Sequence, residues 1–215
     1  MGKADDKIIK TTAQLLFVTD PLCSWCWGML PEVVKLRQIF EPEVEFNLML
    51  AGLQVGNKKP NDIDKQRLLN IWSEVVNVTG QKISGKLPKD PEFIYHSEIP
   101  CRAVKIVQFY QPDLTWDFFT RLQEAFYVEG NNITSVNSLA QLANECGFQK
   151  DIPSLIQDHD IVTATREDFI TAKQLGAHAL PSLLLDTGEG LRLIAGGYTA
   201  AEYLVDMIEA RLQAK

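Results

Sequence analysis

The sequence predicts an α/β fold in which a βαβ unit and a ββα unit are separated by a large all-helical insertion. Two apolar runs, residues 14–18 and 44–50, lie on either side of a segment with helical periodicity. Residues 61–176 then show one helical pattern after another, with no strand of comparable quality. Two more apolar runs, residues 182–186 and 191–195, precede a closing amphipathic segment. This order is typical of a sheet domain that carries a helical insertion.

The N-terminal unit begins with residues 14–18 (QLLFV), which have the length and composition of a short buried strand. Apolar residues recur at helical spacing over 26–40, where Pro31 either ends the first turn or kinks the helix. Residues 44–50 (VEFNLML) begin with apolar and polar side chains in alternation, which indicates a second strand. The unit is therefore predicted as strand, helix, strand.

The middle block contains helical patterns separated by glycine, proline and polar breakers. These patterns cover residues 63–80, 86–93, 97–111, 115–132, 135–147 and 163–176. After them, two short strands joined by a glycine-containing loop predict a β-hairpin, and residues 199–212 predict the last helix. We expect two domains, a discontinuous sheet domain at 12–60 and 177–215 and a helical insertion domain at 61–176.

Composition and charge exclude several classes of function. The 215 residues are 46% hydrophobic, which is enough to bury a substantial core. The net charge of -7 and the lack of basic clusters argue against a nucleic-acid partner, because binding to phosphates depends on clustered Lys and Arg. No apolar stretch approaches the roughly 20 residues of a membrane-spanning helix. The first residues do not resemble a secretory signal, so we expect a soluble protein of the cytoplasm.

The segment DPLCSWCWG, residues 20–28, holds two cysteines three positions apart where the first strand leads into the helix. Side chains three apart on a helix share a face, so Cys23 and Cys26 can form a disulfide. The positive end of the helix dipole favours a thiolate at Cys23, which is the expected nucleophile. Asp20 either opposes this effect as a nearby carboxylate or caps the helix N-terminus.

The other two cysteines, Cys101 and Cys146, are single and lie in segments of helical spacing, where a cysteine is most often a small buried hydrophobe. Four cysteines are too few for a disulfide-stapled scaffold. A structural zinc site commonly uses two closely spaced pairs of ligands, and this chain offers one pair. We therefore expect no metal site.

A second indication of a redox site lies in GAHALPSLLLD, residues 176–186. A proline directly before a strand is an unusual place for an ordinary turn, and cis X-Pro bonds often occupy such positions. Because the chain also has the cysteine pair, we expect a cis bond between Leu180 and Pro181 that faces this pair, rather than a trans proline that starts the strand. The backbone of Leu180 would then pair with an extended substrate.

Three further side chains are candidates for the site. Trp25 and Trp27 flank Cys26 and can offer an apolar platform to unfolded substrate, although at least one is expected in the core, since alternate helix positions face opposite ways. His178, three residues before Pro181, either contacts the site and stabilises a thiolate or lies in a surface loop.

The CSWCWG motif, the helical block with SEIPCRAV and the LPS segment together resemble the DsbA family of thioredoxin-fold oxidoreductases, and in particular its signal-less, FrnE-like bacterial members. This resemblance extends over essentially the whole chain. It implies a thioredoxin-like sheet domain with Cys23 as the attacking cysteine, Cys26 as the resolving one and Pro181 as the cis-proline. The dipeptide Ser-Trp differs from the Pro-His of the periplasmic prototype, which puts a strong-oxidant role in doubt.

The resemblance also implies that Ser24 and Trp25 tune the reduction potential. We expect these two residues, Leu180 and His178 to contact substrate. The expected function is disulfide exchange with thiol- or disulfide-containing protein substrates through a mixed disulfide on Cys23. A reducing cytoplasm favours a reductase or isomerase over a strong oxidase.

The disulfide itself is the expected redox group, with no other cofactor, and the expected reductant is a redox partner protein or glutathione. Two alternatives remain. One is a glutathione-dependent transferase or isomerase of the kappa-class type, whose members usually carry serine in place of Cys23. The other is a non-catalytic redox-sensing or zinc-binding interaction module.

Overall fold

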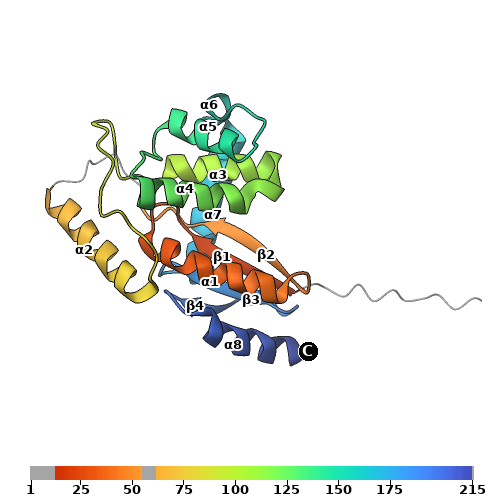
Figure 1. The fold of residues 1–215 in the computed structure, drawn as a ribbon. Coiled ribbons are helices and arrows are strands. Elements are labelled where there is room, and N and C mark those ends of the chain that lie inside the picture. Colours follow the sequence, from red (N-terminus) through yellow and green to blue (C-terminus); the bar gives the residue numbers. More distant parts are fainter. Residues whose placement is uncertain (1–12, 55–61, 215) are drawn as a thin grey trace, which may run out of the picture.

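A mixed four-stranded sheet forms the centre of the protein, whose computed structural model describes residues 13–54 and 62–214 (Figure 1). The strands are β1 (Ala13–Thr19), β2 (Val44–Leu50), β3 (Ser182–Asp186) and β4 (Arg192–Gly196). Their order is β2-β1-β3-β4, with β1 and β2 parallel and the other neighbouring pairs antiparallel. The predicted α/β class is confirmed, and β1 pairs with β3 from the far end of the chain.

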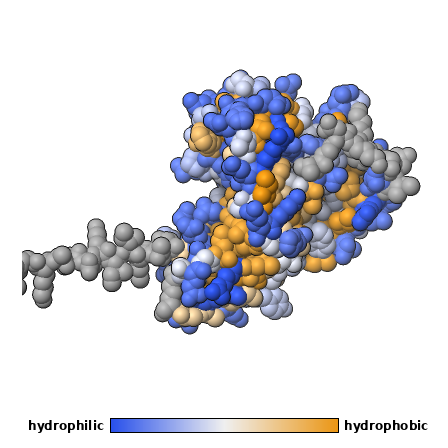
Figure 2. Space-filling model, turned by 180° about the vertical axis from the view of Figure 1, so that it is seen from behind, coloured by the Kyte–Doolittle hydropathy of each residue, from blue (hydrophilic) through white to orange (hydrophobic). Residues whose placement is uncertain are grey.

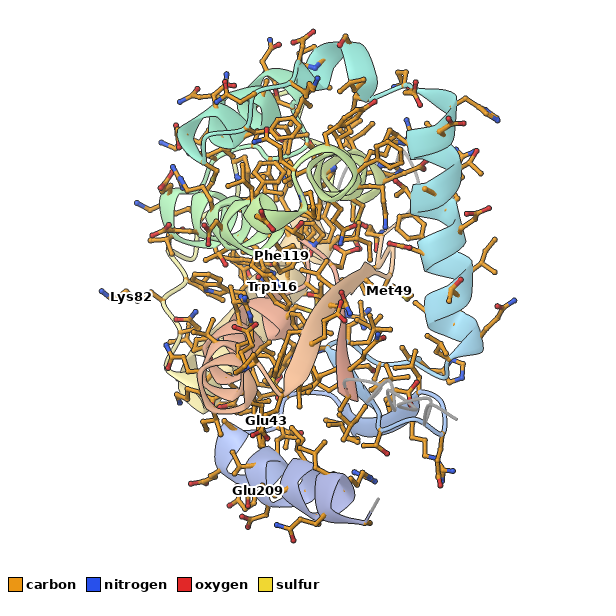
Figure 3. All side chains as sticks on the ribbon, turned by 90° about the vertical axis from the view of Figure 1, so that its right-hand side faces the viewer. Glu43, Met49, Lys82, Trp116, Phe119 and Glu209 are labelled. Atoms are coloured by element: carbon orange, nitrogen blue, oxygen red, sulfur yellow. The ribbon has the colours of Figure 1, made fainter. Side chains whose placement is uncertain are left out.

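Helices cover both faces of this sheet, and β1 carries apolar side chains on both of its sides. Leu15 and Phe17 belong to the main core, to which α1 (Ser24–Phe40) and α8 (Ala201–Gln213) also contribute. Leu16 and Val18 pack instead with Ala172 of α7 (His159–Gln174). Figure 3 shows α7 and α1 on opposite sides of the sheet. The continuous apolar run in β1 follows from this two-sided burial.

The helical block packs directly on the sheet. Its helices are α2 (Asp62–Thr79), α3 (Glu98–Tyr110), α4 (Thr115–Glu124), α5 (Val136–Glu145) and α6 (Ile152–Leu155), followed by α7. In Figure 1, α3 to α6 lie above the sheet and α2 lies to one side. Trp116 and Phe119 of α4 point toward the sheet layer (Figure 3), and the Trp116 ring stacks on Phe17 with centroids 6.1 Å apart. In the described ranges, no helix is long and apolar enough to cross a membrane.

Proline accounts for one wrong helical prediction and is tolerated at another position. Residues 86–93 form no helix, because Pro88 and Pro91 lack the amide proton and disfavour helical geometry in the residue before them. By contrast, α1 continues through Pro31, so that proline does not end the helix. The division into two domains stays a prediction, and its expected boundary at residues 60 and 61 lies outside the described residues.

Two helix ends differ most from the ranges that the pattern of apolar residues predicts. The α-helix predicted over 115–132 ends at Glu124 and is followed by a π-helical turn, Ala125–Glu129. Helix α7 begins four residues earlier than its apolar pattern, at His159, because the Asp158 carboxylate accepts hydrogen bonds from the first backbone amides. Side-chain capping, which apolar periodicity does not register, thus sets where α7 begins.

Side chains from two helices cover the outer edge of β2. Gln108 of α3 donates from Nε2 to the carbonyl oxygen of Leu48 at 2.9 Å. Asp168 of α7 accepts from the Leu50 N–H at 3.4 Å and is ion-paired with Lys105. These contacts satisfy backbone groups that an edge strand otherwise presents to solvent.

Helix α2 packs tightly against α1 at Gly28, the last residue of CSWCWG. A Cβ added at Gly28 would lie 2.8 Å from Cγ2 of Thr79 and 3.1 Å from Cγ1 of Val75, both on α2. The glycine therefore permits close helix packing, which holds α2 beside the cysteine segment.

Replacing Gly28 by alanine is expected to lower the free energy of unfolding by about 1 kcal/mol, because overpacking outweighs the better helix propensity of alanine. Urea unfolding measures this change. Adding Thr79→Ser removes the methyl group that the new Cβ would meet, so it should recover part of the loss. An unchanged midpoint for Gly28→Ala would contradict the close contact.

Candidate active site

The DPLC segment folds into a tight turn that joins β1 to α1. The N–H of Cys23 donates to the carbonyl oxygen of Asp20 at 3.1 Å, and the N–H of Leu22 donates to the Asp20 carboxylate at 2.8 Å. Pro21 occupies the second position of the turn, where its fixed φ is favourable. The Tyr95 hydroxyl donates to the Leu22 carbonyl oxygen at 2.5 Å. These bonds place Cys23 at the N-cap of α1.

Cys23 lines a pocket, whereas Cys26 is fully buried behind it in the first turn of α1. The Cys26 thiol lies within hydrogen-bonding reach of the Cys23 side chain. Burial raises the pKa of Cys26 well above its usual value, and the adjacent Cys23 raises it further, while the Thr19 hydroxyl and the Asp20 backbone partly oppose this. Burial therefore favours the neutral thiol of Cys26 beside Cys23, which lines the pocket but is itself only 5% exposed.

The pocket beside Cys23 has a volume of about 630 Å³. Its apolar lining includes Leu53, Leu68, Ile71 and Leu180, and α2 contributes two charged residues, Asp64 and Arg67. Figure 2 shows that apolar side chains gather across the middle of the face seen from behind. The pocket combines an apolar lining with charge on the α2 side, a combination common in ligand-binding pockets.

The structure brings four of the predicted site residues to this pocket: Cys23, Ser24, Trp25 and Leu180. Ser24 is buried, while Trp25 and Leu180 are half-buried. The Leu180–Pro181 peptide bond is cis, as is the bond between Glu41 and Pro42, which the sequence did not indicate. Pro181 itself is buried beside the site, and its carbonyl oxygen accepts from the Gly197 N–H at 2.7 Å.

Two other candidates lie away from the pocket. Trp27 is in the core, where its Nε1 donates to the Lys82 carbonyl oxygen at 2.9 Å and its ring stacks on Tyr127. Of the two tryptophans, Trp25 is thus the one at the pocket. His178 is exposed and is not among the residues that line the pocket.

Several pocket residues were missed by the sequence interpretation, namely Leu53, Gln54, Arg67 and Tyr95 among others. Arg67 belongs to a helix whose existence was predicted but whose packing was not. Tyr95 follows the segment wrongly predicted as helical, so its position could not be derived from periodicity. An apolar residue just after the second predicted strand, Leu53, was a local signal in the sequence, and the structure shows that its side chain is exposed.

Asp20 is fully buried and does not cap α1, since no side chain provides a capping hydrogen bond there. Its Oδ2 accepts from the Leu53 N–H at 2.7 Å and lies 3.8 Å from Sγ of Cys101. Burial raises the pKa of Asp20, although the N–H groups of Leu53 and Leu22 favour the carboxylate. The capping interpretation was therefore wrong.

The two single cysteines differ in burial. Cys101 is fully buried in α3, as expected, and burial raises the pKa of its thiol well above the usual value. Cys146, at the C-cap of α5, is only partly buried. Within the described ranges, no three His, Cys, Asp or Glu residues gather in a metal-binding arrangement.

Comparisons with known proteins agree with this architecture. A family model described as thioredoxin matches residues 16–200. A candidate protein disulfide isomerase from Nitrosomonas europaea is 28% identical, with a TM-score of 0.87 over 94% of this chain and 98% of that one. The cytosolic disulfide reductase DsbM from Pseudomonas aeruginosa is 19% identical, with a TM-score of 0.77 over 94% of this chain and all of that one.

Curated relatives give a more distant match. The ClpXP adapter protein SpxH from Halalkalibacterium halodurans is 25% identical over 190 residues, which are 84% of this chain and 61% of that protein. The chain thus spans less than two thirds of that relative. Because the thioredoxin model covers well over half of the sequence, the chain belongs to the thioredoxin family and shares the fold of DsbA-type disulfide oxidoreductases.

Proposed function

We propose that the protein is a thiol–disulfide oxidoreductase that acts on protein disulfides through Cys23 and Cys26. One observation carries this proposal: Cys23 lines a peptide-sized pocket at the N-cap of α1, with the buried Cys26 thiol directly behind it. A cysteine that lines a pocket and is backed by a second thiol is the arrangement that two-step disulfide exchange requires.

The reduction of a substrate follows from this geometry. The Cys23 thiolate attacks one sulfur of the substrate disulfide, which forms a mixed disulfide and releases the other substrate sulfur as a thiolate. Cys26 then loses its proton and attacks the Cys23 sulfur. The Cys23–Cys26 disulfide forms, and the second substrate thiol leaves, so the substrate gains two electrons and the protein loses two.

We propose reductase or isomerase activity over strong oxidase activity. The raised pKa of Cys26 does not decide the direction, because Cys26 must be a thiolate both when it resolves the mixed disulfide and when it leaves during substrate oxidation. In a reducing compartment such as the cytoplasm, we place the protein mainly in its dithiol form, ready to attack substrate disulfides. The likeness to the Nitrosomonas europaea protein, described as a candidate disulfide isomerase, supports the same direction.

Insulin reduction with dithiothreitol as electron donor tests this function. The wild type is expected to accelerate reduction, and Cys23→Ser is expected to fall to the uncatalysed rate. Equal rates for the two proteins would exclude the proposed chemistry. The reduction potential of the cysteine pair decides the direction, because a value near or below the cytosolic glutathione poise of about −240 mV fits a reductase.

We further propose glutathione as a reductant or small substrate, because Arg67 lines the same pocket as Cys23 and glutathione carries carboxylates. Arg67→Glu is expected to lower kcat/KM for oxidised glutathione by about fivefold, the range of an exposed ion pair. The rate with the neutral 2-hydroxyethyl disulfide should not change. Arg192→Glu, a charge reversal on exposed β4, serves as the control. Equal losses with both disulfides would contradict a charge-specific role.

A non-catalytic adapter is a second candidate, because the SpxH relative, which is similar over 84% of this chain, is described as a ClpXP adapter. The paired thiols beside a pocket favour exchange chemistry, and the cysteine at position 23 also disfavours a kappa-type transferase. Insulin reduction by wild type no faster than by Cys23→Ser would favour the adapter.

A further inference from the structure

The buried carboxylate of Asp20 takes no part in the exchange steps, yet it contacts both sides of the pocket. Its Oδ1 accepts from the Leu22 N–H at 2.8 Å, in the turn that carries Cys23. Its Oδ2 accepts from the Leu53 N–H at 2.7 Å, in the segment that follows β2. One carboxylate therefore joins the turn of the nucleophile to a second segment of the pocket lining.

Leu53 is the part of that lining most dependent on Asp20. Its side chain is 46% exposed and lines the pocket, so little core packing holds it in place. The neighbouring Gln54 has a further anchor in Ser97, whose N–H donates to the Gln54 carbonyl oxygen at 2.7 Å and whose hydroxyl accepts from the Gln54 N–H at 3.0 Å, and this hydroxyl also bonds to Asp20. The backbone N–H of Leu53 itself is bonded to the Asp20 carboxylate.

This link requires two acceptor oxygens. A carboxylate accepts from two N–H groups at once, whereas an asparagine side chain offers one oxygen and one NH₂ group. In Asp20→Asn, the NH₂ group would face either the Leu22 or the Leu53 N–H, so one of the two bonds is lost. The substitution is nearly isosteric and separates the link from simple packing.

We propose that Asp20 is a positioning residue that fixes the Leu53 wall of the pocket relative to Cys23 and thereby favours disulfides flanked by apolar side chains. This role rests on the proposed exchange function. It predicts that loss of the link weakens the binding of peptide disulfides and leaves the reactivity of the cysteine pair with small disulfides unchanged.

Steady-state kinetics with two probes test this role. One probe is the disulfide-linked dimer of a blocked Leu-Cys-Leu tripeptide, and the other is 2-hydroxyethyl disulfide. Asp20→Asn and Leu53→Ala are each expected to raise KM for the peptide by about fivefold, the equivalent of one hydrogen bond or a small apolar contact. The double variant should show no further increase. For Asp20→Asn, kcat/KM for 2-hydroxyethyl disulfide should stay at the wild-type value.

Asp168→Asn is the matched control. Asp168 also accepts from a backbone N–H, that of Leu50, but it does not line the pocket. Its substitution should leave both KM values unchanged. A change in the reduction potential or in the rate with 2-hydroxyethyl disulfide for Asp20→Asn would overturn the proposal, since it would mean that Asp20 acts on the cysteines. Additive effects in the double variant, or an unchanged KM for the peptide, would overturn it as well.

A measurement on the wild type covers the case in which Asp20→Asn does not fold. The Leu53 amide proton is expected to exchange with solvent at least about tenfold more slowly than in an unstructured peptide, although its side chain is exposed. Unprotected exchange would overturn the link independently of any activity. If wild type and Cys23→Ser reduced the probes equally, the exchange function would fail, whereas the amide measurement would still report on the Asp20 link.

Discussion

Replacing Cys26 by alanine is expected to convert the protein from a catalyst into a trap for its substrates. Cys23 can still attack a substrate disulfide, but the paired thiol that would release the substrate is missing. Turnover in the insulin assay should fall by about 100-fold or more, the size expected when a residue that acts in every cycle is removed. When the reduced variant is mixed with a disulfide substrate without dithiothreitol, a covalent adduct on Cys23 should accumulate, and dithiothreitol added afterwards should release it.

Non-reducing electrophoresis and mass spectrometry measure that adduct. Cys146→Ser is the control, because Cys146 lies at the end of α5 and does not line the pocket. This variant should turn over as the wild type does and accumulate no adduct. If Cys26→Ala retained full turnover, the buried thiol would not be the resolving cysteine, and exchange would proceed through Cys23 alone.

Replacing Trp72 by alanine is expected to lower the free energy of unfolding by about 3–5 kcal/mol, the usual cost of removing a large buried aromatic side chain. Trp72 is 1% exposed on α2, and its ring lies edge-on to Phe126 at 5.6 Å and to Tyr127 at 5.4 Å. The loss should loosen α2 and therefore raise KM for peptide substrates, because Arg67 and Leu68 of α2 line the pocket.

Urea unfolding measures this effect, and Trp72→Phe refines it. The indole Nε1 is buried without a hydrogen-bond partner within the described part of the chain, so phenylalanine removes an unsatisfied donor along with some packing. Its cost should stay below about 1.5 kcal/mol. Tyr203→Ala, on the exposed face of α8, should cost less than about 0.5 kcal/mol. A similarly small effect for Trp72→Ala would show that α2 is not anchored through this ring.

The half of the site built from local sequence patterns could be predicted. Cys23 and Cys26 lie at the junction of a short apolar run and a helix, and both elements are evident from residue spacing alone. The proline before the third strand marked Leu180 as a second wall of the same site. The cysteine inference depends on neighbours within a few positions, where periodicity and turn chemistry are informative, whereas the inference about Leu180 also used the cysteine pair far upstream in the sequence.

The rest of the site depends on packing between residues far apart in the sequence, so it could not be derived in the same way. Tyr95 reaches Leu22 across 73 positions, and Asp20 bonds to Leu53 across 33. Asp20 close before a helix start resembles a capping residue, so a local interpretation gave it the wrong partner. Arg67 was placed on a helix, but the packing of that helix against Gly28 depends on side chains more than 45 positions apart.

The covered edge of β2 has a consequence for how the protein behaves at high concentration. An extended strand from another molecule could add to β2 only by displacing the Gln108 and Asp168 hydrogen bonds and disturbing the ion pair with Lys105. Those side chains therefore hinder the pairing of a strand from another molecule with that edge. Under the proposed function the protein would meet partly unfolded disulfide-containing chains, which are prone to aggregate, and a covered edge would keep their strands from pairing with its sheet.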